Sequence, residues 1–74
     1  MTNIAEKILR AYKNWGIKEG EMLFLQALNT IDPRNTADIY EGVSELKKLG
    51  HLQENDHRFF LTEKGFKYIH SELK

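Results

Sequence analysis

Three histidines and one pair of glutamates are the side chains of this sequence best suited to metal binding or acid–base catalysis. His51 and His57 lie at opposite ends of the first arm of a predicted hairpin, and His70 lies on a later helix. No third ligand converges with them in the sequence, so we predict no metal site. Glu41 and Glu45 have the spacing of a carboxylate pair on a helix, but we interpret them as a solvated pair that repels itself.

Short motifs that bind phosphate or present a nucleophile do not occur in the chain. It has no glycine-rich phosphate loop, no nucleophile elbow and no His-Glu-x-x-His helix. Gly16 and Gly20 are too few and wrongly placed to cradle a phosphate. Cysteine is absent, which excludes disulfides and thiolate metal sites. We therefore predict that the protein is not an enzyme and uses no cofactor.

The length, composition and charge of the chain indicate one small globular domain over residues 1–74. Of its 74 residues, 41% are hydrophobic and 30% are charged. The formal net charge is zero, which excludes a strongly basic domain that binds any nucleic acid through charge alone. The N-terminus lacks a signal-peptide pattern, and the apolar run at residues 22–25 is too short to span a membrane. We expect a soluble cytoplasmic protein with no membrane partner.

Helical periodicity predicts two helices in the first part of the chain. The first is capped by Thr2 or Asn3 and ends at Gly16 in a left-handed conformation. A second helix, apolar nearly all round, is predicted over residues 21–29 and should form the centre of the core. The apolar stripe of the first helix consists of Ile4, Ile8, Leu9, Tyr12 and Trp15.

A third helix is predicted to extend to Leu49 and to be ended by Gly50, which supplies a positive φ. Its start is open between Asp32 as the N-cap, followed by a proline, and a later cap at Asn35 or Thr36. Its inward residues are Ile39, Val43 and Leu46. Placed at 100° per residue, its outward arc holds Arg34, Ala37, Asp38, Glu41, Ser44, Glu45 and Lys48.

After the third helix, the hydrophobic period changes from that of a helix to that of a strand. Arms at residues 51–54 and 58–61 predict an antiparallel β-hairpin. A two-residue turn at residues 55–56 would pair His57 with Glu54.

A final helix is predicted to begin after Thr62, whose hydroxyl caps it. Gly65 within this helix should cost a little stability relative to alanine. The apolar stripe of this helix consists of Phe66, Ile69 and Leu73, joined at its edge by Tyr68.

The segment from Ile39 to Gly65 carries the most specific pattern of the chain. It reads Leu46-x-x-Leu49-Gly50-x-Leu52, and then Leu61-Thr62-x-Lys64-Gly65. With the order helix, helix, helix, hairpin, helix, this pattern resembles the winged helix-turn-helix superfamily, and in particular small bacterial transcriptional regulators of the MarR and PadR type. The resemblance implies an α+β fold, mostly α, with a three-helix core, a two-stranded antiparallel wing and a C-terminal helix. The pattern residues are scaffold, so the resemblance implies the fold more directly than the function.

The resemblance also implies a DNA-binding function, with the third helix in the major groove of double-stranded DNA and the wing on the backbone or the minor groove. Carried over to this sequence, the candidates for reading bases are Asn35, Thr36, Ala37, Tyr40, Glu41 and Ser44. The candidates for contacting phosphates are Arg34, Lys48, and His57 or Arg58 at the wing.

The charges on the third helix keep a second interpretation open. Arg34 and Lys48 share the outward arc with three acidic side chains, which weaken a phosphate-facing surface. The arc is therefore either a DNA-binding surface or a solvated face. The rival function is a winged-helix protein-interaction module that binds no DNA and presents its acidic third helix to a basic partner.

Charge is unevenly distributed along the chain. Residues 1–18 hold four basic side chains and one acidic one, whereas residues 19–62 hold four basic and eight acidic ones. The basic face of the first helix is thus a further candidate for contact with nucleic acid or an acidic partner, or simply the solvated side of that helix.

The aromatic residues Tyr12, Trp15, Tyr40, Phe59 and Phe60 are interpreted first as core residues. Phe59 and Phe60 point to opposite faces of one strand, so one of them must be exposed, covered by Trp15 or Tyr40, or buried against a second chain. We expect a homodimer, with the apolar stripe of the last helix extending the interface. The alternative is a monomer whose last helix folds back on the wing.

Overall fold

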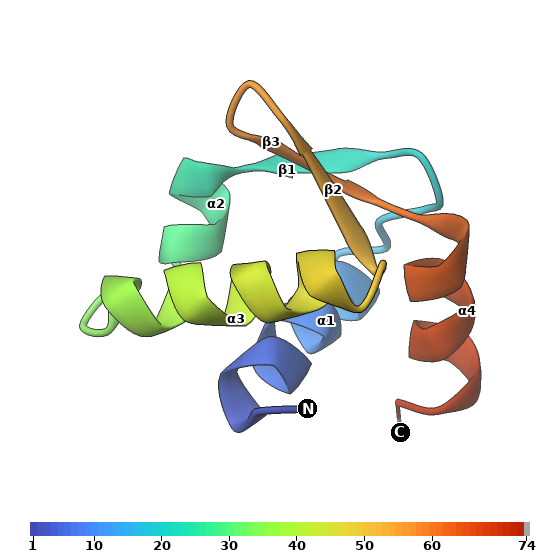
Figure 1. Ribbon diagram of the computed structural model, residues 1–74, viewed down its shortest axis with the longest axis horizontal. Coiled ribbons are helices and arrows are strands. Elements are labelled where there is room, and N and C mark those ends of the chain that lie inside the picture. The colour runs from blue at the N-terminus through green and yellow to red at the C-terminus, as the bar shows by residue number, and fades with distance from the viewer. Residues whose placement is uncertain (74) are drawn as a thin grey trace.

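The computed structural model describes residues 1–73 of the chain. Within these residues the chain forms an α+β fold with four helices and one three-stranded antiparallel sheet. In chain order the elements are α1 (Asn3–Asn14), β1 (Met22–Phe24), α2 (Leu25–Asn29), α3 (Thr36–Lys48), β2 (Leu52–Asn55), β3 (Arg58–Leu61) and α4 (Glu63–Ser71). The sheet crosses over α1 and α3, while α2 and α4 lie at opposite sides of the molecule (Figure 1).

The first helix forms as predicted. The Thr2 hydroxyl accepts a hydrogen bond from the Ala5 backbone N–H at 3.2 Å, and Gly16 follows the helix with a φ of 68°. α1 packs against α3 at Gly42, where an added Cβ atom would lie 2.8 Å from Cδ1 of Ile8. The glycine therefore allows the two helices to approach closely.

The helix predicted over residues 21–29 is wrong in its first half. Its first three apolar residues form β1, and only the five residues of α2 are helical. β1 pairs with β3, so the predicted two-stranded wing is part of a three-stranded sheet with the order β1-β3-β2. An apolar run without a clear period fits either structure, and here the free edge of β3 satisfies the backbone of the run as a strand. In consequence Leu28 is buried, but Phe24 is 48% exposed and does not lie in the core.

The third helix takes the later of the two predicted starts. It begins at Thr36 with Asn35 at the N-cap, so the prediction of Asp32 as the N-cap is wrong. Its C-cap is Leu49, and Gly50 follows with a φ of 81°. The three residues predicted to face inward are buried.

The hairpin forms, but its turn lies one residue later than predicted. Asp56 and His57 occupy the two turn positions with φ values of 54° and 61°, and Asn55 pairs with Arg58. Both residue types adopt positive φ more readily than most. The predicted pairing of His57 with Glu54 is therefore wrong. The shift moves each pairing by two residues, so every side chain keeps its predicted face.

The junction between the hairpin and α4 is held by Thr62 and Gly65. The Thr62 hydroxyl accepts from the Gly65 backbone N–H at 3.0 Å and donates to the Gly50 carbonyl oxygen at 2.6 Å. A Cβ atom added to Gly65 would overlap the carbonyl oxygen of His51. The expectation that Gly65 only costs stability relative to alanine is wrong, because this close approach requires glycine.

A single core joins all four helices to the sheet. Tyr12 is fully buried, and its hydroxyl donates to the Phe59 carbonyl oxygen at 2.8 Å. Trp15 and Tyr40, in contrast, are 48% and 53% exposed, so their predicted place in the core is wrong. The buried apolar residues are Ala5, Ile8, Leu9, Tyr12, Leu28, Ile39, Val43, Leu46, Leu52, Phe59, Leu61, Ile69 and Leu73.

The last helix packs against α1. Ile69 and Leu73 are buried within the single chain, and the Lys13 Nζ donates to the Leu73 carbonyl oxygen at 3.1 Å. The prediction that these two apolar residues extend a dimer interface is therefore wrong. No helix within residues 1–73 is both long enough and apolar enough to cross a membrane.

Candidate nucleic-acid interface

The residues predicted to bind DNA lie in two places, along α3 and at the turn between β2 and β3. All eight are exposed to solvent. We call them together the α3–hairpin surface: Arg34, Asn35, Thr36, Tyr40, Ser44, Lys48, His57 and Arg58. The hairpin rises from the C-terminal end of α3, and its turn lies nearer to α2 than to α3 (Figure 1).

At the start of α3, one predicted base-reading residue is engaged in a local contact. The Asn35 Nδ2 donates to Oδ2 of Asp32 at 3.1 Å, and the Lys7 Nζ lies 3.6 Å from the same oxygen. The Asn35 hydrogen bond and the nearby Lys7 charge hold the pKa of Asp32 below its usual value. An Asn side chain has a second N–H and a carbonyl oxygen, so Asn35 keeps groups that can contact a ligand.

Along the middle of α3, three predicted contacts share one stripe. Tyr40, Ser44 and Lys48 recur every four residues, which places them side by side on the helix surface. Together with Glu41 and Glu45 they line a shallow hollow of about 380 Å³. The exposed Tyr40 ring and the Lys48 amine thus lie on the same face of α3.

Glu45 differs from the other acidic residues of α3 because it is bound to the start of the chain. The Thr2 backbone N–H donates to both carboxylate oxygens of Glu45, at 3.0 and 3.2 Å, and the Met1 amino group lies 3.8 Å away. Hydrogen bonding from Thr2 and the Met1 charge lower the pKa of Glu45. Its negative charge is therefore partly offset within the protein. The other two acidic residues of the arc, Asp38 and Glu41, form no ion pair with residues 1–73.

The turn of the hairpin is anchored against the start of α2. The Leu25 backbone N–H donates to the His57 carbonyl oxygen at 3.3 Å. The Arg58 guanidinium carbon lies 5.8 Å from the centroid of the Phe24 ring, within cation–π range. Arg58 therefore keeps its charge at the surface while its position is restrained by an aromatic ring.

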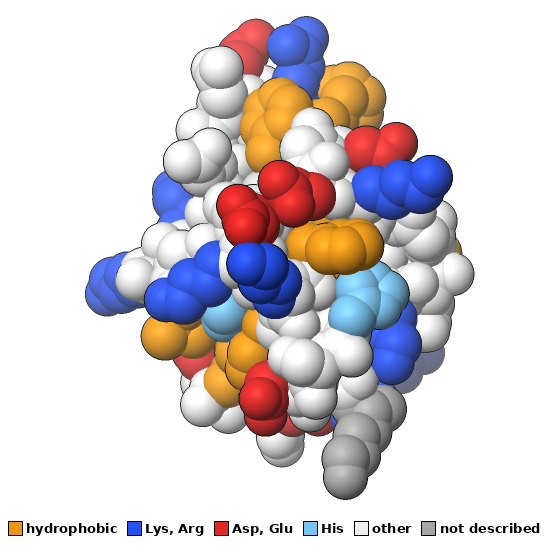
Figure 2. All heavy atoms as spheres, turned by 90° about the vertical axis from the view of Figure 1, so that its right-hand side faces the viewer, with side chains coloured by type: hydrophobic (Ala, Val, Ile, Leu, Met, Phe, Trp, Pro, Cys, Tyr) orange, Lys and Arg blue, Asp and Glu red, His pale blue; other side chains and the backbone are white. Residues whose placement is uncertain are grey.

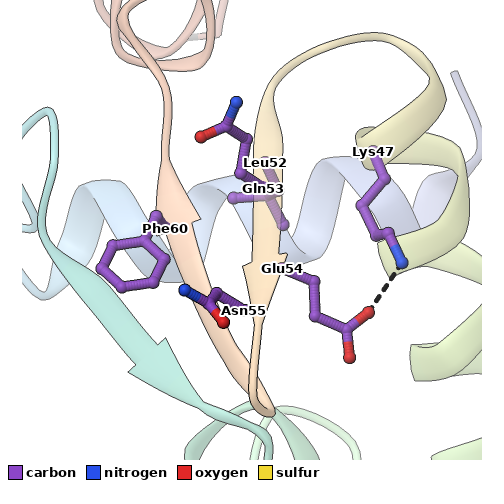
Figure 3. A pocket seen from close by; sticks show the side chains of 6 residues that line it. All are labelled: Lys47, Leu52, Gln53, Glu54, Asn55 and Phe60. Carbon is purple, nitrogen blue, oxygen red and sulfur yellow. Dashed lines mark hydrogen bonds and ion pairs between the residues drawn. The ribbon is translucent and has the colours of Figure 1, made fainter.

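Between α3 and the hairpin turn, an ion pair occupies the space along β2. The Lys47 Nζ lies 2.7 Å from Oε1 of Glu54. Figure 3 shows this pair on one side of β2, with the Phe60 ring on the other side, toward β1. These residues border a hollow of about 630 Å³. Because Lys47 is paired, its charge contributes less to a phosphate-binding surface than that of Lys48.

The cations of the α3–hairpin surface differ from several other cations of the protein because they form no ion pairs with the described residues. In the part of the chain that the structure describes, Lys7, Arg10, Lys47, Lys67 and the Met1 amino group each pair with a carboxylate. Arg34, Lys48 and Arg58 pair with none. The arginine and lysine side chains predicted to contact phosphates are thus exposed and available.

Lys64 is a further cation outside these ion pairs that the sequence prediction did not place at a site. It lies beside Gly50, next to the buried His51. It belongs to the Leu-Thr-x-Lys-Gly pattern, which was interpreted as scaffold. The sequence signal that could have identified Lys64 as a candidate binding residue is its positive charge, which contrasts with the acidic middle of the chain.

The histidines lie apart from one another. Across residues 1–73, no group of three or more His, Asp or Glu side chains is placed to hold a metal ion. His51 is 5% exposed, its ring centroid lies 4.8 Å from that of Tyr68, and its Nδ1 has no hydrogen-bond partner among residues 1–73. Burial and the nearby Lys64 charge lower the pKa of His51. His51 is therefore held as a neutral ring at the junction of α3, β2 and α4.

Comparison of the chain with protein-family models, with curated proteins and with solved structures found no match.

Proposed function

We propose that this protein is a winged helix-turn-helix protein that binds double-stranded DNA through its α3–hairpin surface and acts as a small transcriptional regulator. The element order supports the fold assignment. A short helix and a turn precede α3, which has one exposed face, and a hairpin follows α3 directly. The sheet order, in which the hairpin's second arm lies between β1 and β2, is compatible with such a wing.

The observation that carries the proposal is that the three cations predicted to contact phosphates are exposed and form no ion pair with the described residues. These cations are Arg34, Lys48 and Arg58. Phosphate contacts supply much of the affinity of DNA-binding proteins, and they require cations that are free to exchange solvent counterions for phosphate.

The acidic residues of α3 oppose DNA binding less than their number suggests. Glu45 is held by the Thr2 backbone and the Met1 amino group. The arc then has two exposed acidic side chains, Asp38 and Glu41, and two exposed basic ones, Arg34 and Lys48, so its exposed charges sum to zero. We infer weak electrostatic affinity and a dependence on a few well-placed contacts.

The experiment that tests the proposal is a titration of a labelled duplex library with the protein, followed by fluorescence anisotropy at two salt concentrations. Binding is expected at about 50 mM salt and should weaken as salt rises. Lys48→Ala and Arg58→Ala should each lower the slope of log affinity against log salt by about one. Lys18→Ala, which removes an equal charge outside the α3–hairpin surface, is the matched control and should leave the slope unchanged. Absence of binding at the lower salt concentration contradicts the proposal.

A second candidate function rests on the exposed acidic and aromatic side chains of α3. Asp38 and Glu41 are exposed and form no ion pair among the described residues, and Glu41 lines the same hollow as the 53% exposed Tyr40. This combination suits a protein-interaction module whose α3 binds a basic partner. Glu41→Lys distinguishes the two functions, because it should raise DNA affinity under the first and abolish partner binding under the second.

We also propose that the regulator acts as a homodimer. Since Ile69 and Leu73 are buried within one chain, the interface has to use other side chains, and Trp15 is the large exposed apolar residue on α1's end. Light scattering across a range of protein concentrations tests this proposal. A mass of one chain at every concentration rejects it.

A further inference from the structure

A second surface with binding chemistry lies away from α3, where the end of α1 meets α4. It is a hollow of about 250 Å³, which we call the α1–α4 hollow. The described residues that line it are Lys13, Gly16, Ile17, Lys18, Phe66 and His70. None of the six is acidic, and none belongs to the α3–hairpin surface.

The floor of the α1–α4 hollow is apolar and concave. The rings of Phe66 and His70 have centroids 4.5 Å apart and are tilted by 56° to each other. Ile17 and Phe66 are each half-buried against the core. The two tilted rings and the isoleucine therefore form a recess that fits one apolar side chain, and its volume is below the range of about 300–1,000 Å³ that is usual for small-molecule and cofactor sites.

The rim of the hollow carries Lys13 and Lys18, the lysines of the basic N-terminal segment that pair with no carboxylate of residues 1–73. Of the four cations in residues 1–18, Lys7 and Arg10 pair with Asp32 and Glu6. Lys13 binds only the Leu73 carbonyl oxygen, and the Lys18 amine has no partner among the residues that the structure describes. The excess of positive charge in the N-terminal segment is thus concentrated at this hollow.

Figure 2 shows the face of the molecule that carries α4. Near its centre, a hydrophobic side chain lies beside a histidine, with Lys and Arg side chains around them, acidic side chains directly above them and another acidic side chain lower on the face. Within residues 1–73 one of the acids near this face, Glu63, is already paired with Lys67 at 2.9 Å. The apolar centre of the face is therefore surrounded by side chains of both charges, whereas the charged side chains that line the hollow itself are Lys13 and Lys18.

We propose that the α1–α4 hollow binds an acidic peptide segment of a partner protein, with one apolar side chain of the peptide inserted between Ile17 and Phe66. The carboxylates of the segment would lie along Lys13 and Lys18. Charge complementarity selects the acidic partner, and the small apolar recess selects a single anchoring side chain. Because the two surfaces share no residue, a regulator that binds DNA through α3 could hold such a partner at the same time.

The geometry favours a peptide over a single-stranded nucleic acid. Stacking of bases requires aromatic faces that lie open to solvent, together with a groove of several cations that follows the backbone. Here the Phe66 and His70 rings are tilted toward each other. With centroids 4.5 Å apart, the two rings already contact each other, so they do not offer two parallel open faces on which successive bases stack.

The test uses a fluorescein-labelled ten-residue peptide made of aspartate and glutamate with one central phenylalanine. Two matched peptides carry serine in place of the phenylalanine, or lysine in place of all the acids. The protein should bind the first peptide with a Kd on the order of 0.1 mM at low salt. The serine peptide should bind about tenfold more weakly, because a phenylalanine side chain no longer leaves water. The lysine peptide should not bind.

Two charge-reversal variants of the protein locate the site. Lys18→Glu should weaken binding of the acidic peptide about tenfold, and the Lys18 side chain makes no described hydrogen bond whose loss would disturb the fold. Lys48→Glu introduces the same change on α3 and should alter peptide affinity less than twofold. In ¹H–¹⁵N correlation spectra, the peptide should shift the signals of Gly16, Ile17, Lys18 and His70.

Three results would overturn the proposal. They are no binding at millimolar peptide, peptide-induced shifts that fall on α3 instead of the hollow, or equal affinity of the wild type and Lys18→Glu. A ten-residue oligothymidylate is titrated in parallel. If it shifts the hollow's signals at lower concentration than the peptide does, the site binds nucleic acid and the peptide proposal is wrong.

Discussion

The α3–hairpin surface and the α1–α4 hollow both present cations outside ion pairs, but they place them in different surroundings. On α3, Lys48 lines a shallow hollow together with two acidic side chains, Glu41 and Glu45. At the α1–α4 hollow, Lys13 and Lys18 border an apolar floor, and the lining residues that the structure describes include no acidic side chain. The difference teaches that a chain of zero net charge can hold one surface suited to a regular array of phosphates and another suited to an acidic peptide.

Gly65 and Gly42 lie at close contacts between elements, and substituting these glycines should have the largest effect. Gly65→Ala should lower the free energy of unfolding by about 2–4 kcal/mol, because the new methyl group overlaps the His51 backbone carbonyl, which cannot move alone. Gly42→Ala is the matched change at the α1–α3 contact. There the obstructing atom is the flexible Cδ1 of Ile8, and alanine favours the helix, so the loss should be clearly smaller.

Urea unfolding followed by circular dichroism measures both changes. If Gly65→Ala is no less stable than Gly42→Ala, the hairpin–α4 junction is not held as the structure indicates.

Charge reversal on each surface tests whether the two surfaces are independent for DNA binding. Lys48→Glu should weaken duplex binding about tenfold at low salt, because it removes one phosphate contact and adds a repulsive charge. Lys18→Glu should change duplex affinity less than twofold. Fluorescence anisotropy with a labelled duplex gives both values. Equal losses would mean that DNA senses only the overall charge of the protein.

The junction of α3, β2 and α4 should respond to pH through His51. Burial and Lys64 lower its pKa in the folded state, so the unfolded chain binds more protons at mildly acid pH. Stability from this residue is fully present above the unfolded pKa of about 6.5 and is lost as pH falls below it toward the lower folded value. The slope should not exceed about 1.4 kcal/mol per pH unit.

Urea unfolding between pH 7.5 and pH 5 measures this slope. His51→Gln should flatten it, whereas His70→Gln, a matched change on the exposed side of α4, should leave it in place. A slope that survives His51→Gln shows that another group is responsible.

The smallest effect concerns the two glutamates that line the same hollow on α3. Glu41→Gln should raise duplex affinity about twofold to threefold at low salt, since it removes an exposed repulsive charge. Glu45→Gln should raise it less, because Thr2 and the Met1 amino group already offset that charge. The anisotropy titration compares the two variants directly. A larger effect at Glu45 would contradict the importance of its contact with the N-terminus.

Local signals in the sequence predicted much of the fold. The Thr2 and Thr62 caps, the positive φ of Gly50 and the inward residues of α3 all depend on neighbouring residues, and each is confirmed. β1 was missed because a short apolar run has no diagnostic period, and its strand conformation depends on an edge of β3 more than thirty residues away. Gly65 was misjudged for the same reason, since the carbonyl that it contacts lies on another element.

The candidate site was predictable to a different degree. The exposure of all eight predicted residues follows from helical geometry and from turn chemistry. The ion pairs that separate Lys47 from Lys48 could not be predicted, because they depend on where Glu54 lies after folding. The α1–α4 hollow was hidden for a similar reason. The basic first helix was evident, but the sequence did not show that Phe66 and His70 of α4 would lie beside Lys13 and Lys18.

The most direct test of the account is a ¹H–¹⁵N correlation spectrum of the protein titrated with a duplex library at about 50 mM salt. If DNA binds the α3–hairpin surface, signals from residues 34–48 and from His57 and Arg58 shift on DNA addition, while those of Lys18 and His70 stay in place. An unchanged spectrum, or shifts confined to the α1–α4 hollow, would contradict it.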